Sequence, residues 1–126
     1  MLLCDTNIFI EVFRQNAVIR AELEKIGRNN IAVSDITLGE LFYGAINKAE
    51  LTVISNDLSQ ISVLHINEEI SQMAVNMVEQ YCLSHKLDIN DAIIAATAIY
   101  HNIELFTLNV KDFKFIHNIK LHPLLS

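Results

Sequence analysis

The chain has 126 residues and a net charge of −6, and it is 52% hydrophobic and 19% charged. This composition is typical of one globular domain, expected over residues 1–126, and excludes an intrinsically disordered chain. With three glycines and one proline, the sequence has no GxGxxG dinucleotide motif and too few turn residues for a β-sandwich. The acidic balance argues against binding nucleic acid through a broad basic surface, but not through bound divalent cations.

The sequence predicts a cytoplasmic protein. No cationic segment precedes the apolar start, which Asp5 interrupts, so we expect no signal peptide. No apolar run approaches the roughly 20 residues of a membrane span. Cys4 and Cys82 both lie among apolar residues, so we expect buried, reduced thiols rather than a disulfide.

Short apolar runs alternate with helical patterns along the chain. We expect helices over residues 6–13, 17–26, 34–45, 51–61, 70–81 and 90–100, and a short turn or helix near 113–115. Strands are expected at residues 2–4, 31–33, 62–66 and 104–107, and residues 119–121 are a candidate edge strand. This alternation predicts an α/β fold with a mainly parallel sheet of four to five strands, covered by helices on both faces.

Two of the expected helices have informative patterns. In residues 70–81 the apolar side chains recur at i, i+3, i+4, i+7, i+8 and i+11, which is typical of an amphipathic helix. Residues 90–100 are apolar nearly all round and rich in alanine. We therefore expect this second helix to be central and tightly packed.

Oxygen-bearing side chains follow the expected strands. In an open parallel sheet the active crevice lies at the carboxyl ends of the strands. Four separate segments deliver carboxylate or amide oxygens to that edge. The side chains are Asp5, Glu40, Asp88, Asp91, Asn109 and Asp112.

Most of these side chains also have a purely structural interpretation. Asp5 can cap the helix over residues 6–13. Asp88 or Asn90 can cap the alanine-rich helix, with Asp91 as a favourable charge in its first turn. Asp112 can be an ordinary surface acid. Taken together these interpretations are weaker, because like charges converging on one crevice repel unless a cation neutralises them.

Glu40 allows a similar choice. Thr37-x-x-Glu40 matches a capping box. A helix that begins nearer Ser34 or Asp35 instead puts Glu40 one turn inside, among apolar neighbours. We then expect a partly buried carboxylate, which needs a partner or a metal ion.

Clustered oxygen ligands favour the hard cations Mg²⁺ or Mn²⁺. Such ions assist hydrolysis of phosphodiester bonds by activating water and stabilising negative charge. Zinc is disfavoured, because the five histidines lack ligand spacing and CxxC is absent. We expect the histidines to be solvated or at the edge of the core.

Four stretches that contain these residues follow one another in a characteristic order. They are LLCDTNIFIEVF at 2–13, SDITLGELFYGA at 34–45, LDINDAIIAATAIYHNIELFTLNVKDF at 87–113 and IKLHPL at 119–124. In this combination the chain resembles the PIN-domain ribonucleases, and among them the VapC-like toxins of bacterial toxin–antitoxin pairs. The third stretch carries the most specific part of the resemblance.

The resemblance implies a three-layer α/β/α PIN-like fold and a Mg²⁺- or Mn²⁺-dependent endoribonuclease. It also implies structured RNA substrates, such as transfer or ribosomal RNA, as well as homodimers and a cognate antitoxin that blocks the site. Asp5, Glu40 and Asp91 match the family's metal-binding acids. The fourth position is open between Asn109, where many PIN domains have Asp, and Asp112, three residues later.

Other residues have supporting roles in this interpretation. Thr6 and Asn7 would orient the first acid through hydrogen bonds, and Asp88 is a candidate for the outer ligand sphere. The candidate phosphate contacts near the rim are Lys111, Lys114 and Arg14, for which solvated surface charge is the alternative.

An antitoxin segment needs a groove on the toxin. Candidate lining residues are Phe9, Phe13, Phe42 and Tyr43. We expect at least two of these aromatic residues to lie in the core instead.

Two other functional classes compete with a nuclease. A PIN-like interaction module without catalysis is supported by Asn109 and by the acidic balance, but the three matching acids argue against it. A phosphotransfer enzyme fits poorly, because a haloacid-dehalogenase-like site needs a second Asp where Asn7 stands. The pattern of a response-regulator receiver also fits poorly.

Overall fold

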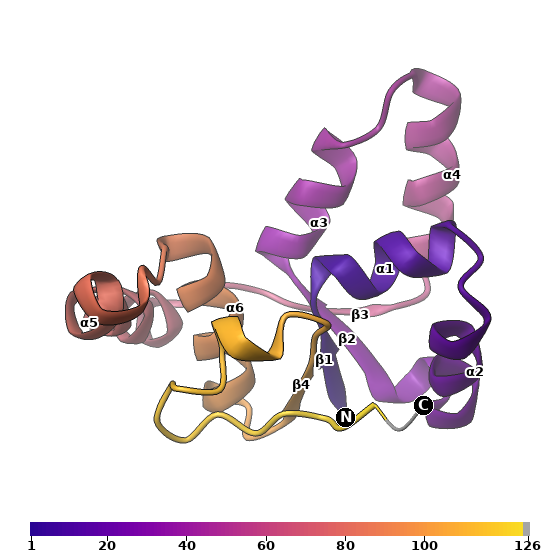
Figure 1. Cartoon of the computed structure of the whole chain (residues 1–126). Helices are drawn as coiled ribbons and strands as arrows, with labels where there is room; N and C mark the ends of the chain where they lie inside the picture. The colour runs from indigo at the N-terminus through magenta and orange to yellow at the C-terminus, as the bar shows by residue number, and fades with distance from the viewer. Residues whose placement is uncertain (125–126) are drawn as a thin grey trace.

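The computed structural model describes residues 1–124, so the last two residues of the expected domain lie outside it. Regular elements follow one another with short connections (Figure 1). In chain order they are β1 (Leu2–Cys4), α1 (Thr6–Phe13), α2 (Ala17–Ile26), the 3₁₀ turn η1 (Arg28–Asn30), β2 (Ile31–Ser34), α3 (Asp35–Tyr43), α4 (Lys48–Leu58), β3 (Ser62–Leu64), α5 (Glu68–His85), α6 (Ile89–Tyr100), β4 (Glu104–Phe106) and the 3₁₀ turn η2 (Val110–Asp112).

The four strands form one parallel sheet in the order β3-β2-β1-β4. β1 lies in the centre, where Leu3 pairs with Ala32 of β2 and with Leu105 of β4. The mainly parallel sheet of four to five strands is therefore confirmed, with four strands.

The expected edge strand at residues 119–121 was wrong. Leu121 forms only an isolated parallel bridge with Leu105. The Leu105 N–H donates to the Lys120 carbonyl, and the His122 N–H donates to the Leu105 carbonyl. The chain thus touches β4 over a single residue, and the His122 ring then lies between the carboxylates of Glu22 and Glu104, at 3.0 and 3.2 Å.

Alternation along the strands divides the core into two layers. Leu3, Ala32 and Leu105 point to the face covered by α5 and α6. Leu2, Cys4, Ile31, Val33 and Phe106 point to the opposite face, covered mainly by α1, α2, α3 and α4. Side chains of a strand alternate between faces, so each strand contributes to both layers. The three-layer α/β/α architecture is confirmed (Figure 1).

Helix α6 is the buried helix that its composition predicts. Its alanines at 92, 95, 96 and 98 are completely buried, and Ile94 is almost so. Small side chains allow α6 to lie close to both α5 and the sheet. This packing fixes the position of the N-terminus of α6, and with it the position of Asp91.

Capping residues set helix boundaries that periodicity alone misplaced. Asn47 and Asn67 accept backbone hydrogen bonds from Glu50 and Ile70, so α4 begins at Lys48 and α5 at Glu68. Helix α5 continues to His85 and ends at Lys86, whose φ is 54°. The expected range of residues 70–81 was too short at both ends, because it included only the part of α5 in which apolar side chains recur periodically.

The two cysteines differ from each other. Cys4 is buried as expected, and its burial raises the pKa of its thiol to about 12. Cys82 is exposed on α5, so the expectation of burial was wrong for it. Its apolar sequence neighbours point to different faces of the helix, and Leu83 is itself almost fully exposed.

None of the helices within residues 1–124 combines the length and apolarity needed to cross a membrane.

Candidate active site

Asp5 lies where β1 ends and α1 begins. The residue is almost completely buried, at 6% exposure. One oxygen, Oδ1, accepts from the Thr6 N–H at 2.8 Å and caps α1. The other, Oδ2, accepts from the Thr107 hydroxyl at 2.8 Å. Asp5 is therefore both a helix cap and a fixed carboxylate at the carboxyl edge of the sheet.

The register of the sheet explains this contact. Cys4 of β1 pairs with Phe106 of β4, so the residues that follow them, Asp5 and Thr107, are neighbours. The Asp5 N–H also donates to the Phe106 carbonyl at 2.9 Å. Sequence reasoning missed Thr107, although its place directly after β4 was a usable signal once β4 is known to lie beside β1.

Asn7 supports the same carboxylate less directly. Its Nδ2 lies 3.4 Å from Asp5 Oδ2 and from Thr107 Oγ1, and its Oδ1 accepts from the Leu108 N–H at 3.2 Å. Asn7 thus ties the segment after β4 to α1. The expectation that Thr6 and Asn7 orient the first acid agrees with these contacts.

Glu40 projects from α3, which begins at Asp35 with Ser34 as its cap. The Thr6 hydroxyl donates to Glu40 Oε1 at 2.7 Å and lies 3.1 Å from the Thr37 hydroxyl. Glu40 is exposed, so the expectation of partial burial was wrong. Leu38 and Leu41 pack into the core layer on this side of the sheet, whereas Glu40 lines the cavity that α3 shares with α1 and α4.

Asp91 lies in the first turn of α6. Its backbone N–H donates to Asp88 Oδ1 at 2.9 Å, so Asp88 is the N-cap of this helix. Burial raises the pKa of Asp91 to about 7, and the carboxylates of Asp88 and Asp5 add to the shift. Asp112 and Glu40 contribute in the same direction.

The carboxylates repel one another across the site. Burial raises the pKa of Asp5, while hydrogen bonds from Thr107 and Thr6 lower it and the charges of Glu40 and Asp112 raise it again. Asp5, Glu40, Asp91 and Asp112, from four separate segments, thus interact electrostatically. A bound cation would relieve this repulsion.

Asp112 and Asn109 were alternatives for the fourth position. Asp112 is the last residue of η2, and its negative charge helps to raise the pKa of both Asp5 and Asp91. Asn109 is exposed, and its backbone N–H donates to the Thr107 hydroxyl at 3.0 Å. Of the two, Asp112 is the one whose charge acts on the other acids, whereas the Asn109 backbone contacts Thr107.

The donor chemistry of the cluster fits a hard cation, since it consists of carboxylate oxygens. Within residues 1–124, no group of three or more His, Cys, Asp or Glu side chains is arranged so that it could hold a metal ion as it stands. Glu40 and Asp112 are both exposed and can adjust to an ion.

Beside the acids, a cavity of about 750 Å³ lies between α1, α3 and α4. Phe13 and Leu41 line it together with Arg14, and it reaches Glu40. The candidate phosphate contact Arg14 thus belongs to the cavity wall. Its guanidinium group also lies 3.5 Å from the Glu11 carboxylate.

The four candidate aromatic residues are distributed differently from the expectation. Only Phe9 is buried, so the expectation of at least two core residues was wrong. Phe13 and Phe42 are partly exposed, and Tyr43 is 93% exposed. Phe42 and Tyr43 lie at the end of α3, where α3 and α4 extend away from the sheet and leave fewer partners to cover them (Figure 1).

Comparison with known proteins agrees with this arrangement. The sequence model of the PIN domain family matches residues 2–116. Ribonuclease VapC19 of Mycobacterium tuberculosis is 32% identical over 124 residues, which cover 95% of this chain and 98% of that protein. A toxin–antitoxin complex from Klebsiella pneumoniae contains a chain of 33% identity, with a TM-score of 0.81 and coverage of 94% and 95%. VapBC2 from Rickettsia felis, bound to a DNA fragment from its promoter, matches at 29% identity and a TM-score of 0.81, covering 96% of each chain. The chain belongs to the PIN domain family, in the branch of the VapC ribonucleases.

Proposed function

We propose that this protein is a metal-dependent endoribonuclease that acts as the toxin of a cytoplasmic toxin–antitoxin pair. The observation that carries the proposal is the convergence of Asp5, Glu40, Asp91 and Asp112 on one edge of the sheet, where burial and their mutual charges raise the pKa of Asp5 and Asp91. Such a cluster of repelling carboxylates is suited to binding cations and poorly suited to stabilising the fold.

The metal proposed for this site is Mg²⁺ or Mn²⁺, held by the same four carboxylates. A bound divalent cation supplies Lewis acidity that makes water more acidic and stabilises the negative charge of phosphodiester displacement. The oxygen-only donor set supports this choice over zinc.

The residues of the chain itself hold the ligands in place. The Thr6 N–H and the Thr107 hydroxyl each occupy one oxygen of Asp5, which fixes the orientation of its carboxylate. The Thr6 hydroxyl fixes Glu40, so one residue orients two acids from α1 and α3. Asp88 fixes the first turn of α6 and thereby Asp91. This preorganisation lowers the cost of binding a cation and an RNA phosphate.

We further propose that an antitoxin segment occupies the cavity between α1, α3 and α4. The related chain from Klebsiella pneumoniae was solved in a toxin–antitoxin complex. The cavity offers apolar side chains such as Ile10, Phe13 and Leu41, and it ends at Glu40. A segment with apolar anchors and one basic side chain would fit this wall and reach the acids. A homodimer, which light scattering tests, completes the proposed assembly.

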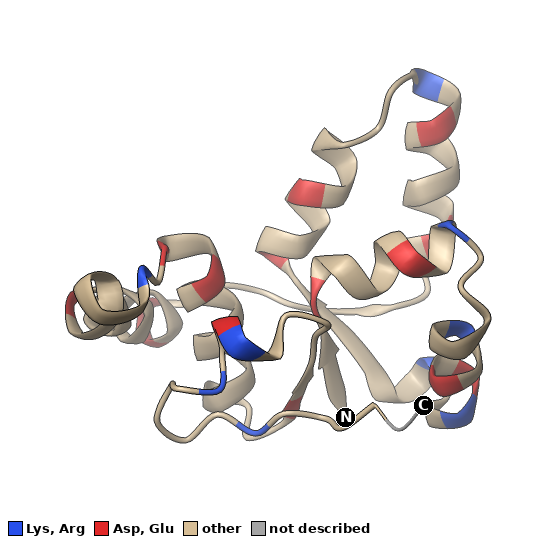
Figure 2. Ribbon diagram, viewed as in Figure 1, with Lys and Arg blue, Asp and Glu red and all other residues tan. Residues whose placement is uncertain are grey.

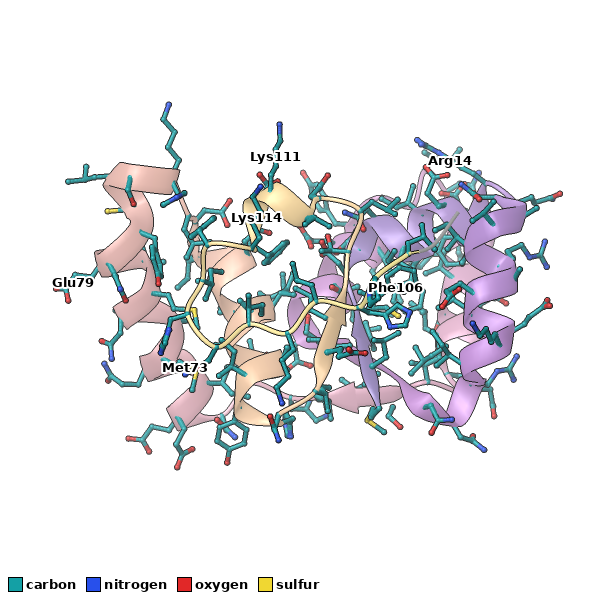
Figure 3. The ribbon with its side chains drawn as sticks, turned by 60° about the horizontal axis from the view of Figure 1, so that its bottom comes forward. Arg14, Met73, Glu79, Phe106, Lys111 and Lys114 are labelled. Atoms are coloured by element: carbon teal, nitrogen blue, oxygen red, sulfur yellow. The ribbon has the colours of Figure 1, made fainter. Side chains whose placement is uncertain are left out.

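The first experiment is cleavage of total cellular RNA by the purified protein, with Mg²⁺ or Mn²⁺ against EDTA. Discrete fragments that need the metal and vanish in Asp5→Asn and Asp91→Asn would support the nuclease. Mapping the fragment ends tests transfer and ribosomal RNA as targets. Glu79→Gln is the matched control, because Glu79 is exposed on α5 and projects away from the site (Figure 3).

The alternative is a PIN-like interaction module without catalysis. It predicts no fragments and no heat of binding for Mg²⁺ or Mn²⁺ from a protein that is folded by circular dichroism. This combined result would overturn the nuclease proposal.

A further inference from the structure

The two sides of the acidic site differ in how many cations are free of an ion pair. On the side of α1, α3 and α4, the cavity wall carries Arg14 and Arg20 against three acids, Glu40, Glu50 and Asp57. Arg14 is also paired with Glu11. This side offers little net attraction to a polyanion.

The opposite side, formed by the α5–α6 loop and by η2, carries three lysines beside the acids Asp88, Asp91 and Asp112. Lys86 lies in the loop, two residues before Asp88, and Lys111 and Lys114 flank Asp112. All three lysines are exposed. Figure 2 shows blue segments in the loop and around η2, close to the acids of α6 and η2. In Figure 3, Lys111 of η2 and Lys114, which follows η2, lie near each other, and Arg14 lies apart from both.

These lysines are not neutralised within the chain. Among the described residues, no carboxylate lies within 4.0 Å of the amino group of Lys86, Lys111 or Lys114. Although the protein has a net charge of −6, three lysines without an ion-pair partner lie beside the proposed active site. Their position suits contacts to phosphates that flank the one being cleaved.

An aromatic cluster continues this surface. The rings of His85 and Phe115 are stacked, with centroids 3.9 Å apart and planes at 11°. Tyr81 packs edge-on against both rings, and its hydroxyl accepts from the His117 N–H at 3.2 Å. Phe115 and Tyr81 pack against the core, whereas His85 is exposed. The core thus holds Tyr81 and Phe115 in place, and the imidazole ring of His85 is accessible to solvent.

Lysines and rings are adjacent in the chain. His85 directly precedes Lys86, and Phe115 directly follows Lys114. Flat side chains interleaved with cations are the combination that binds single-stranded nucleic acid, because bases stack on the rings while phosphates contact the cations. We call Lys86, Lys111, Lys114 and His85 the lysine–histidine face.

We propose that the RNA substrate runs from the acidic site across the lysine–histidine face, with its phosphates on Lys111, Lys114 and Lys86 and one base stacked on His85. This inference rests on the proposed function, since it assumes that RNA is the substrate. It assigns the α5–α6 side to the substrate and leaves the α1–α3–α4 cavity to a protein partner.

The phosphate contacts are tested with a short, fluorescein-labelled, single-stranded RNA of mixed sequence, whose binding is followed by anisotropy in EDTA. We expect Lys111→Ala/Lys114→Ala to weaken binding about tenfold and to flatten the plot of log affinity against log salt by about 1.4, or about 0.7 for each lost phosphate contact. In cleavage assays the same variant should raise KM and leave kcat unchanged.

The matched control for charge is Lys25→Ala/Lys120→Ala. Lys25 lies in the last turn of α2, before β2, and the Lys120 amino group donates to Asn102, before β4, so both lie toward the amino ends of the strands. We expect this variant to bind and cleave RNA like the wild type. If both double variants lose affinity equally, the effect is one of net charge and the proposed face is wrong.

Stacking is tested at His85. We expect His85→Ala to bind the same RNA about tenfold more weakly, and His85→Tyr, which keeps a flat ring, to stay within about twofold of the wild type. Wild-type binding by the alanine variant, or an equal loss in both variants, would overturn the stacking contact.

Wild-type cleavage separates this proposal from the one on which it rests. If the wild type does not cleave RNA with Mg²⁺ or Mn²⁺, the proposed function fails. If it cleaves RNA and the lysine variants behave like the control, only the lysine–histidine face is overturned.

Discussion

At the scale of single residues, the sequence allows two interpretations of Asp5, as a helix cap and as a metal ligand, and the structure is compatible with both. It caps α1 through Thr6, and its other oxygen faces Thr107 and the remaining acids. A helix cap is not stabilised by neighbouring carboxylates. Metal ligands, in contrast, must lie close together to share a cation, so they repel one another when the cation is absent.

Asp5→Asn separates these roles, because asparagine is also a good cap but carries no charge. We expect RNA cleavage to fall at least about a hundredfold, since a charged ligand is lost. The free energy of unfolding without metal should be unchanged or higher, because repulsion from Glu40 and Asp112 disappears. Urea denaturation in EDTA measures this free energy of unfolding. A clear loss of stability would show that Asp5 is mainly a structural cap.

Asp91 gives a prediction about pH. Burial and neighbouring carboxylates raise its pKa from 3.8 to about 7. The folded state therefore binds this proton more tightly than the unfolded state, and ionisation opposes folding. The contribution to stability is complete below pH 3.8 and is lost as the pH rises through about 7.

The comparison is between wild type and Asp91→Asn in EDTA, by urea denaturation over this pH range. We expect the wild type to lose on the order of 1 kcal/mol relative to the variant as pH rises, after allowance for solvent screening. Added Mg²⁺ should reduce the difference, since a cation stabilises the ionised form. Parallel pH profiles in EDTA would contradict the prediction.

At the scale of elements, α6 decides where Asp91 lies. Its buried alanines let α6 approach α5 and the sheet, and Ala96 has no exposed surface. A larger side chain at that point must displace its neighbours.

We expect Ala96→Leu to lower the free energy of unfolding by about 1–3 kcal/mol, because the core is already filled. It should also lower RNA cleavage, since a displaced α6 moves Asp91. Ala49→Leu is the matched control, because Ala49 is exposed on α4. Equal stability of the two variants in urea would show that the α6 interface can adapt.

At the scale of the whole molecule, the net charge of −6 opposes the approach of RNA. The basic residues of the lysine–histidine face compensate only locally. Cations at the acidic site are therefore expected to contribute to substrate binding as well as to chemistry.

We expect Mg²⁺, added at constant ionic strength, to strengthen binding of the labelled RNA to the wild type. Anisotropy is read at early times, and a denaturing gel checks that the single-stranded RNA is still intact. Asp5→Asn should respond much less, and Glu79→Gln should respond like the wild type. An equal response of all three proteins would mean that Mg²⁺ acts on the RNA alone.

Much of the fold was predictable because it follows from local patterns. The strands at residues 2–4 and 31–33 and the alanine-rich helix could be read from runs of apolar residues, and the parallel sheet followed from their alternation. Cys82 and the helix boundaries at Asn47 and Asn67 were misjudged, since apolar neighbours in sequence do not share a helix face and caps are short-range polar signals.

The sequence by itself determined the kind of site, because the acids follow strands whose carboxyl ends meet at one edge. Only the tertiary structure decided how the site is completed. The β1–β4 register brings Thr107 to Asp5, the open face of α3 leaves Glu40 exposed, and η2 brings Asp112 into the cluster while Asn109 holds Thr107. These contacts join residues about a hundred positions apart, and their geometry depends on how whole elements pack, which no local pattern of residues encodes.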